Sequence, residues 1–305
     1  MRRRGTNMAR SNTNYPGYDT GGASYWVKRS LIYIVVLAGA LWMVLPIWWV
    51  ITTSLSEAPV ASDIVFYPRN FTLDNFLKLW ELRDRIPIFN WFFNSVVVGL
   101  AVTGFNLIFD SLAGYSLAKI EFIGRDKIFL LFIATMMIPG MITLIPMYLL
   151  IAEFGLLNTH AGLMLPFIAK PFGIFVFRQY FKGLPSSLGD AALIDGCNKL
   201  QVFYKIYLPM AKPAVASVGI IVFMGFWNNF TWPFILMSDT EMYTLPAALY
   251  TAQTNYFTDW GMLMAITLIL VLPLLLLFIA LQKYFIRGMT MTGVKGCPIP
   301  FAQMS

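Results

Sequence analysis

Six long apolar runs constrain the fold of this 305-residue chain more than any other feature. A helix needs about 20 apolar residues to cross a bilayer, and each run is near that length. The runs lie at residues 31–52, 91–117, 127–151, 161–181, 206–237 and 261–285. The fifth contains Pro209, Pro213 and Pro233, so we expect only residues 214–236 to form its membrane helix. The sequence therefore predicts an all-α membrane protein with six transmembrane helices.

The charged residues indicate the orientation of these helices. They make up 12% of the chain, whereas soluble domains carry about 25%. If both termini are cytoplasmic, the inner segments hold 17 Lys and Arg residues and the outer segments hold four, Arg69, Lys78, Arg83 and Arg85. Basic residues collect on the cytoplasmic side of membrane proteins. The net charge of +7 is thereby explained without a nucleic-acid partner, and both termini are predicted to be cytoplasmic.

The ends of the chain are polar. Residues 1–24 lack the apolar core of a signal peptide and are predicted to be a disordered cytoplasmic tail. Residues 25–296 then form the transmembrane domain, and residues 297–305 form a C-terminal tail. Cys197, Cys297 and the single His160 are too far apart in the sequence to suggest a disulfide framework or a metal site.

The segment 184–213, between the fourth and fifth runs, is predicted to form two short cytoplasmic helices. Pro185 ends the preceding element, Ser186 or Ser187 can cap a new helix, and Asp190 suits a capping box with Ser187. Gly196 supplies a stop. A helix this short is not stable alone in water, so it must pack on a partner. Ala191 and Ala192 add little bulk and would let that partner approach closely.

This segment resembles the EAA loop of ABC-importer permeases. The resemblance rests on Asp190-Ala191-Ala192, Asp195-Gly196, Leu208-Pro209 and Lys212-Pro213. Asn94-Ser95 and residues 113–118, 154–159, 227–233, 243–246 and 288–296 are similar to the maltose-type branch, so the resemblance covers about residues 26–296. The family usually begins its motif with Glu. We expect Asp190 to keep the capping role.

The resemblance implies a type I ABC-importer permease fold in a bacterial or archaeal cytoplasmic membrane. Its coupling helix would carry Asp190, Ala191, Ala192, Asp195 and Gly196 and would dock on an ATPase subunit. Family members work as two permease subunits, often non-identical, with two ATPase subunits inside and a solute-binding protein outside. The expected cargo is a carbohydrate. The tail from Gly293 to Gly296 is a second candidate contact with the ATPase.

The chain itself is not expected to be an enzyme. It has no G-x-x-x-x-G-K-[ST] phosphate loop, so ATP and Mg²⁺ would bind on the separate ATPase subunit and this chain would need no cofactor.

Polar and aromatic residues inside the predicted spans are candidates for the substrate path. Lys170 could balance Asp110, contact a backbone carbonyl beside Pro171, or line a wet cavity that carries an acidic oligosaccharide. Asn228 and Asn229 offer amide groups beside the flat rings of Trp227 and Trp232, which is what sugars need. The same side chains could instead join helices to one another.

Two other function classes deserve comparison. An ion-coupled secondary transporter would need a membrane-embedded acidic site and usually repeat symmetry, but Asp110 stands almost alone among the spans. A membrane enzyme would need a nucleophile paired with a base, and the spans offer no such pair. An ATP-driven carbohydrate importer is therefore the preferred interpretation, with the secondary transporter as the alternative.

Overall fold

A computed structural model describes residues 23–57, 59, 66–68, 70–255 and 259–290. The chain divides into two compact units, residues 1–49 and 50–305. Within the described residues the regular structure is helical, with one isolated bridge between Ser56 and Phe71, which confirms the all-α prediction. The predicted C-terminal tail, the Gly293 to Gly296 contact and residues 1–22 of the predicted N-terminal tail lie outside these residues.

The helices follow one another along the chain with short connections. In order they are α1 (Ala23–Ser54), α2 (Asp74–Glu81), α3 (Ile88–Lys119), α4 (Arg125–Thr135), α5 (Gly140–Glu153), α6 (His160–Met164), η1 (Leu165–Phe167), α7 (Pro171–Lys182), α8 (Ser187–Ile194), α9 (Lys199–Val202), η2 (Phe203–Tyr207), α10 (Leu208–Met210), α11 (Lys212–Trp227), α12 (Thr231–Leu236), η3 (Thr240–Met242), α13 (Leu245–Asn255) and α14 (Trp260–Thr290).

Three of the described helices are long and apolar enough to cross a membrane unbroken, namely α1, α3 and α14. Three bent pairs raise the number to six if each pair is one span: α4 with α5, α6–η1 with α7, and α9–α10 with α11. In α1 the run from Leu31 to Leu37 is apolar apart from Tyr33, as suits a helix that crosses a membrane.

Three of the predicted spans are broken where a continuous helix was expected, and one of them is the run 161–181, which bends by 44° between η1 and α7. The run 127–151 bends by 97° between α4 and α5, because Pro139 disfavours helical geometry in the residue before it. The predicted helix 214–236 stops at Trp227, and the chain turns at Asn228 before α12 begins. These breaks leave backbone N–H and C=O groups that need partners inside the membrane.

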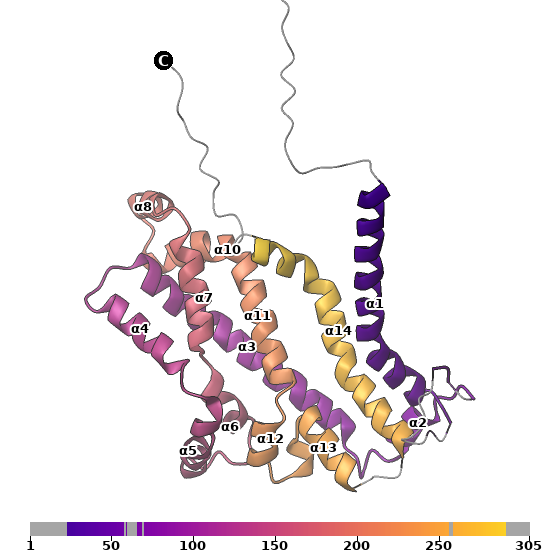
Figure 1. The fold of residues 1–305 in the computed structure, drawn as a ribbon. Coiled ribbons are helices and arrows are strands. Elements are labelled where there is room, and N and C mark those ends of the chain that lie inside the picture. The colour runs from indigo at the N-terminus through magenta and orange to yellow at the C-terminus, as the bar shows by residue number, and fades with distance from the viewer. Residues whose placement is uncertain (1–22, 58, 60–65, 69, 256–258, 291–305) are drawn as a thin grey trace, which may run out of the picture. The chain divides into compact units, whose positions relative to one another are not determined.

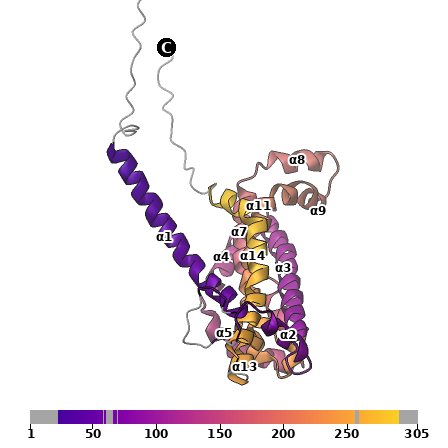
Figure 2. The same ribbon diagram turned by 90° about the vertical axis from the view of Figure 1, so that its right-hand side faces the viewer.

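Within residues 50–290 the helices define two ends of the molecule. Figure 1 shows α8 and α10 at one end and α2, α12 and α13 at the other, and the rotated view in Figure 2 keeps α8 and α13 at opposite ends. The long helix α3 runs between these ends and packs against α7 and α11.

At the end that holds α13, polar side chains of α3 bind the backbone of the segment around η3. Asn94 Nδ2 donates to the carbonyls of Glu241 at 2.8 Å and Tyr243 at 3.1 Å. Ser95 Oγ accepts from the N–H of Leu245 at 2.7 Å. Both α3 side chains are buried, so these bonds fix the connection that leads into α13.

The same end is closed by contacts between α2 and the start of α14. Lys78 Nζ lies 2.9 Å from Asp259 Oδ2, and the N–H of Met262 donates to Asp259 Oδ1 at 3.1 Å. Burial alone would raise the pKa of Asp259, but these hydrogen bonds outweigh it and hold that pKa below its ordinary value.

Near the middle of α3, two buried side chains bind the break before α7. Asn106 Nδ2 donates to the carbonyl of Phe167 at 2.6 Å, and Asp110 Oδ1 accepts from the backbone N–H of Lys170 at 2.9 Å. Phe167 and Lys170 flank the 44° bend. Helix α3 therefore supplies hydrogen-bond partners for backbone groups that the bend leaves without helical ones.

At Gly114, the helices α3 and α7 approach each other closely. A Cβ at Gly114 would lie 2.6 Å from Phe177 Cβ and 2.9 Å from the backbone nitrogen of Arg178. Both contacts belong to the body of α7, so a side chain there would force the helices apart.

We predict that Gly114→Ala lowers the free energy of unfolding by about 1–3 kcal/mol. Gly104→Ala is the matched control, because it lies on the same helix and its Cβ would meet nothing within 4 Å. The control should be neutral or more stable by roughly 0.5–1 kcal/mol, since alanine favours the helix. Thermal unfolding in lipid nanodiscs measures both, and equal stability of the two variants would contradict the packing described.

Candidate functional site

The segment predicted to dock on a partner forms the short helix α8. Its N-cap residue is Ser186, and that side chain makes no capping hydrogen bond to the helix. The predicted capping box of Ser187 and Asp190 is therefore wrong, because the helix already includes Ser187. The Ser186 hydroxyl instead accepts from Lys119 Nζ at 3.2 Å. Asp190 lies in the first turn, where its negative charge favours the positive end of the helix dipole.

Gly196 ends α8 as the sequence predicts. Its φ of 86° is a left-handed conformation that favours glycine. The N–H of Cys197 donates to the carbonyl of Ala192 at 2.9 Å, and the N–H of Gly196 donates to that of Leu193 at 3.1 Å. This pair of bonds is a Schellman motif, which gives the last carbonyls of the helix their partners.

The chain then returns through α9, the π-helical turn η2 and α10. Asn198 and Gln201 form the capping box that starts α9, with both reciprocal hydrogen bonds at 2.8 Å. Phe203 and Tyr207 of η2 are buried against the cluster that contains Phe181 and Tyr115. The loop is therefore ordered and packs against the ends of α3 and α7.

Helix α8 has two faces of different character. Gly189 and Ala192 are buried, and a Cβ at Gly189 would lie 2.8 Å from Tyr207 Oη. Asp190, Ala191 and Asp195 are exposed, as is Gly196. Both alanines were expected to face a partner. Ala191 is exposed as expected, but Ala192 packs against the rest of the loop. A helix of this length turns every third or fourth residue inward, so neighbours cannot share a face.

The exposed face of α8, which is called the open face below, also carries large apolar side chains. Ile194 is 87% exposed and Leu193 is 45% exposed. They follow Asp190 and Ala191 along the same helix and precede the rigid turn at Gly196. A rigid, partly apolar and partly acidic face at the end of the molecule suits contact with another protein.

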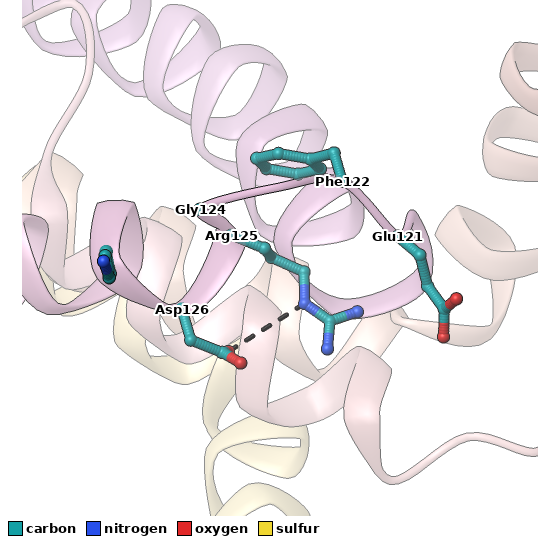
Figure 3. Close-up of a pocket in the computed structure, with 6 residues that line it drawn as sticks. Glu121, Phe122, Gly124, Arg125 and Asp126 are labelled. Atoms are coloured by element: carbon teal, nitrogen blue, oxygen red, sulfur yellow. Dashed lines mark ion pairs between the residues drawn. The ribbon is translucent and has the colours of Figure 1, made fainter.

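The pocket at the same end lies between α3 and α4. It has a volume of about 300 Å³ and is lined by Glu121, Phe122, Gly124, Arg125, Asp126 and Lys127. Figure 3 shows the Arg125 side chain turned toward Asp126, with their nearest charged atoms 3.9 Å apart. Two acids and two bases balance one another here. Across the described residues, no group of three or more His, Cys, Asp or Glu side chains could hold a metal ion.

Arg178 connects the two helices that border this pocket. Its guanidinium lies 2.6 Å from Asp126 Oδ1, donates to the carbonyl of Leu117 at 3.1 Å and sits 3.7 Å from the centre of the Phe129 ring. One buried side chain of α7 therefore ties the end of α3 to the beginning of α4. The pocket shares Asp126 with this connection.

The two tryptophans predicted to line the substrate path are inside the packed core. Trp227 is 1% exposed and Trp232 is 2% exposed. Their indole N–H groups donate to the carbonyls of Leu270 at 3.0 Å and Gly162 at 3.3 Å. Both indoles therefore join helices, which was the alternative open to them from the sequence.

The predicted polar residues of the path are more accessible. Asn228 is exposed at the turn after α11, and its Nδ2 donates to the carbonyl of Met224 at 3.0 Å. Asn229 is half-buried, and its Oδ1 accepts from the N–H of Trp232 at 3.2 Å. The structure thus separates Asn228, which faces outward, from Asn229, which stabilises the start of α12.

Lys170 lies at the break before α7 and is half-buried. Its Nζ sits 4.3 Å from the centre of the Phe226 ring, which is a cation–π contact. Asp110 accepts from the backbone N–H of Lys170 at 2.9 Å, and no described ion pair joins the Lys170 amine to Asp110. Asp110 thus has a structural part at the helix break, where it binds the backbone N–H of Lys170.

Two residues that bind residues 184–186, just before α8, were not predicted as functional. Lys119 and Tyr207 both bind the chain just before α8. The motif around Tyr115 ends one residue before Lys119, so the sequence carried a signal, but nothing in the spacing showed which distant loop that end of α3 would meet.

The chain is similar to known proteins over most of its length. The sequence pattern of the family described as "Binding-protein-dependent transport system inner membrane component" matches residues 110–291. An arabinooligosaccharides transport system permease protein of Halalkalibacterium halodurans is 40% identical over 233 residues, which are 76% of this chain and 83% of the relative. A Bacillus subtilis protein of the same description is 34% identical over 293 residues, or 95% of this chain and 100% of the relative.

The chain is also similar to a relative whose name refers to lactose and to a solved structure. A lactose transport system permease protein of Rhizobium radiobacter is 34% identical over 259 residues, covering 84% of this chain and 93% of the relative. The crystal structure of a bacterial ABC transporter involved in the import of the acidic polysaccharide alginate contains a chain that matches with a TM-score of 0.76 and 25% identity. The match covers 88% of this chain and 99% of that one.

The rigid end of α8 yields a prediction. Gly196→Ala should loosen the last turn, because a left-handed residue with a Cβ costs roughly 1–2 kcal/mol. Hydrogen exchange of residues 187–194 should become about tenfold faster. Gly183→Ala is the control in the same loop, since its φ is −72° and its nearest Cβ contact would be 3.4 Å away. Equal exchange in both variants would show that Gly196 does not set the turn.

Proposed function

Since the chain belongs to the family of inner membrane components of binding-protein-dependent transport systems, we propose that it carries a carbohydrate into the cell as part of an ATP-driven importer. The chain is a transmembrane permease subunit of an ABC importer, and ATP hydrolysis resides on a separate subunit. It is a multi-pass membrane protein. The relatives give no support to the alternative of an ion-coupled secondary transporter.

The proposed coupling site is the open face of α8. The observation that carries it is the exposure of Ile194 and Leu193 on a helix whose other face is fixed to the protein by Gly189 and Ala192. A groove on an ATPase subunit would cover these apolar side chains, and Asp190 would remain near the rim. Asp195 and Gly196 then set the angle at which the chain leaves the contact.

The distribution of basic residues supports a cytoplasmic position for α8 and for both termini. Basic residues near the α8 end include Arg125, Lys127, Lys182, Lys199, Lys205 and Lys212. The opposite end carries Lys78, Arg83 and Arg85. Since basic loops stay in the cytoplasm, the α8 end faces inward and the α2 and α13 end faces outward.

The proposed assembly follows from this orientation. Two ATPase subunits, which would hold ATP and Mg²⁺, dock on the inner face. A second, non-identical permease subunit completes the membrane pathway, and an extracytoplasmic solute-binding protein delivers the cargo at the end that holds α2 and α13. The chain itself needs no cofactor in this scheme.

The proposed cargo is an oligosaccharide. The names of relatives refer to arabinooligosaccharides and lactose, and the similar solved transporter imports an acidic polysaccharide. Exposed Asn228 offers a hydrogen-bonding amide, and the half-buried amine of Lys170 offers a positive charge beside the ring of Phe226. A positive charge on this amine in the pathway would favour an acidic sugar over a neutral one.

The docking role of α8 can be tested with one exposed side chain. We predict that Ile194→Asp reduces co-purification of the ATPase subunits by about tenfold, because a charge replaces a side chain buried at the contact. Ile123→Asp is the control, since Ile123 is 103% exposed in the loop between α3 and α4. Normal ATPase recovery with Ile194→Asp would refute docking through this face.

The role of Lys170 in cargo selection needs a comparison of two sugars. We predict that Lys170→Met lowers uptake of an acidic oligosaccharide by about tenfold, equivalent to about 1.4 kcal/mol, and spares a neutral one. Lys182→Met, at the exposed end of the same helix, should change neither. Uptake in proteoliposomes with the solute-binding protein measures both sugars. An equal loss for the two sugars would assign Lys170 a structural part only.

A further inference from the structure

The last residue of α3 binds the chain that leads into α8. Lys119 Nζ donates to the carbonyl of Leu184 at 2.6 Å and to the hydroxyl of Ser186 at 3.2 Å. Ser186 is the residue from which α8 starts. Because the amine is charged, these are among the stronger hydrogen bonds a side chain makes. The cytoplasmic end of a long membrane helix is thus bonded to the beginning of the coupling helix.

Tyr207 completes the contact from the other side of the loop. It is 2% exposed, and its Oη donates to the carbonyl of Pro185 at 3.2 Å. The Lys119 amine lies 5.2 Å from the centre of its ring. A Cβ at Gly189 would meet Tyr207 Oη at 2.8 Å, so the tyrosine fills the space beneath α8. Three consecutive residues before α8 therefore have polar groups bound by Lys119 or Tyr207.

The return half of the loop is bound to the same helix. Tyr115 Oη, one turn before Lys119, donates to the carbonyl of Lys199 at 3.1 Å. The Tyr115 ring centre lies 5.6 Å from that of Tyr207 and 5.2 Å from that of Phe203. Tyr207 and Phe203 belong to the π-helical turn η2, a kind of turn often found at functional positions. Helix α3 therefore holds the loop before α8 and after it.

We propose that Lys119 and Tyr207 are positioning residues that transmit the movement of α8 to α3 during transport. The proposal rests on the docking of α8 on an ATPase subunit. When the ATPase moves α8, the charged bonds at residues 184–186 and the packed ring beneath Gly189 move with it. Helix α3 also binds the break at Phe167 and the connection at Glu241, so its displacement reaches the pathway and the outer end.

The contacts favour transmission over docking. Tyr207 is buried and Lys119 is turned toward the loop backbone, so neither lies on the open face that Ile194 occupies. Loss of either should leave the ATPase bound and should separate its hydrolysis from transport. A role in folding alone would lower assembly and transport together.

The test measures sugar uptake per ATP hydrolysed by the complete complex in proteoliposomes. Lys119→Met keeps the length of the side chain but removes its charge, and Tyr207→Phe removes only the hydroxyl. We expect uptake per ATP to fall by about three- to tenfold in both, with ATPase recovery unchanged. Lys119→Arg should restore most of the ratio, since it keeps the charge and the donors.

The controls lie on the same inner end. Lys182→Met removes an exposed lysine from the end of α7, and Tyr204→Phe removes the hydroxyl of a tyrosine that is 47% exposed on η2. Both should keep the ratio of the parent complex. If Lys119→Met fails to assemble, Tyr207→Phe decides the matter, because it preserves the ring that packs beneath α8.

The variants test the docking of α8 and the transmission to α3 separately. If Tyr207→Phe and any assembled Lys119→Met complex transport with the parent ratio, the transmission proposal is wrong. If Ile194→Asp leaves ATPase recovery intact, docking through α8 is wrong and the transmission proposal falls with it. Loss of recovery with Ile194→Asp, together with normal ratios in the Lys119 and Tyr207 variants, refutes transmission alone.

Discussion

Every backbone N–H and C=O group inside a membrane must find its partner within the protein, and this requirement organises the structure. The chain interrupts several of its membrane helices, and α3 supplies the partners at the break before α7. Asn94 binds the carbonyls around η3, Asn106 binds that of Phe167, and Asp110 accepts the N–H of Lys170. Without Asn106 and Asp110, each backbone group left exposed at the break before α7 would cost several kcal/mol, so this break depends on α3.

One helix that binds other elements at both of its ends and at its middle can also connect them in function. One end of α3 holds the segment that enters α13, its middle holds the break beside Lys170, and its other end holds the loop that carries α8. A permease must link an event at its ATPase to an opening in the membrane. A stiff helix bonded at all three levels offers a continuous physical route for that link, through which small movements pass as displacement of whole elements.

The sequence predicted the unbroken helices and the short helix α8 better than the helix breaks. Spans 91–117 and 261–285 lie within α3 and α14, and Gly196 ends α8 because only glycine favours its φ of 86°. Pro139 was hidden within an apolar run, and hydropathy does not distinguish a straight helix from one bent by 97°. The same limit applies to Trp227 and Trp232: composition shows that a ring is present, but tertiary packing decides whether it faces a pathway or a neighbouring helix.

The central claim is that α8 is the inner contact with the ATPase, and proximity tests it most directly. With Cys197 and Cys297 replaced by Ser, Ile194→Cys in native membranes, treated with a short bifunctional thiol reagent, should cross-link to a single-cysteine ATPase partner, whereas Ile123→Cys in the same background should not. The residue should also react with a membrane-impermeant thiol reagent only from the cytoplasmic side. Labelling of Ile194→Cys from the outside, or the absence of any cross-link in an assembled complex, would contradict the account.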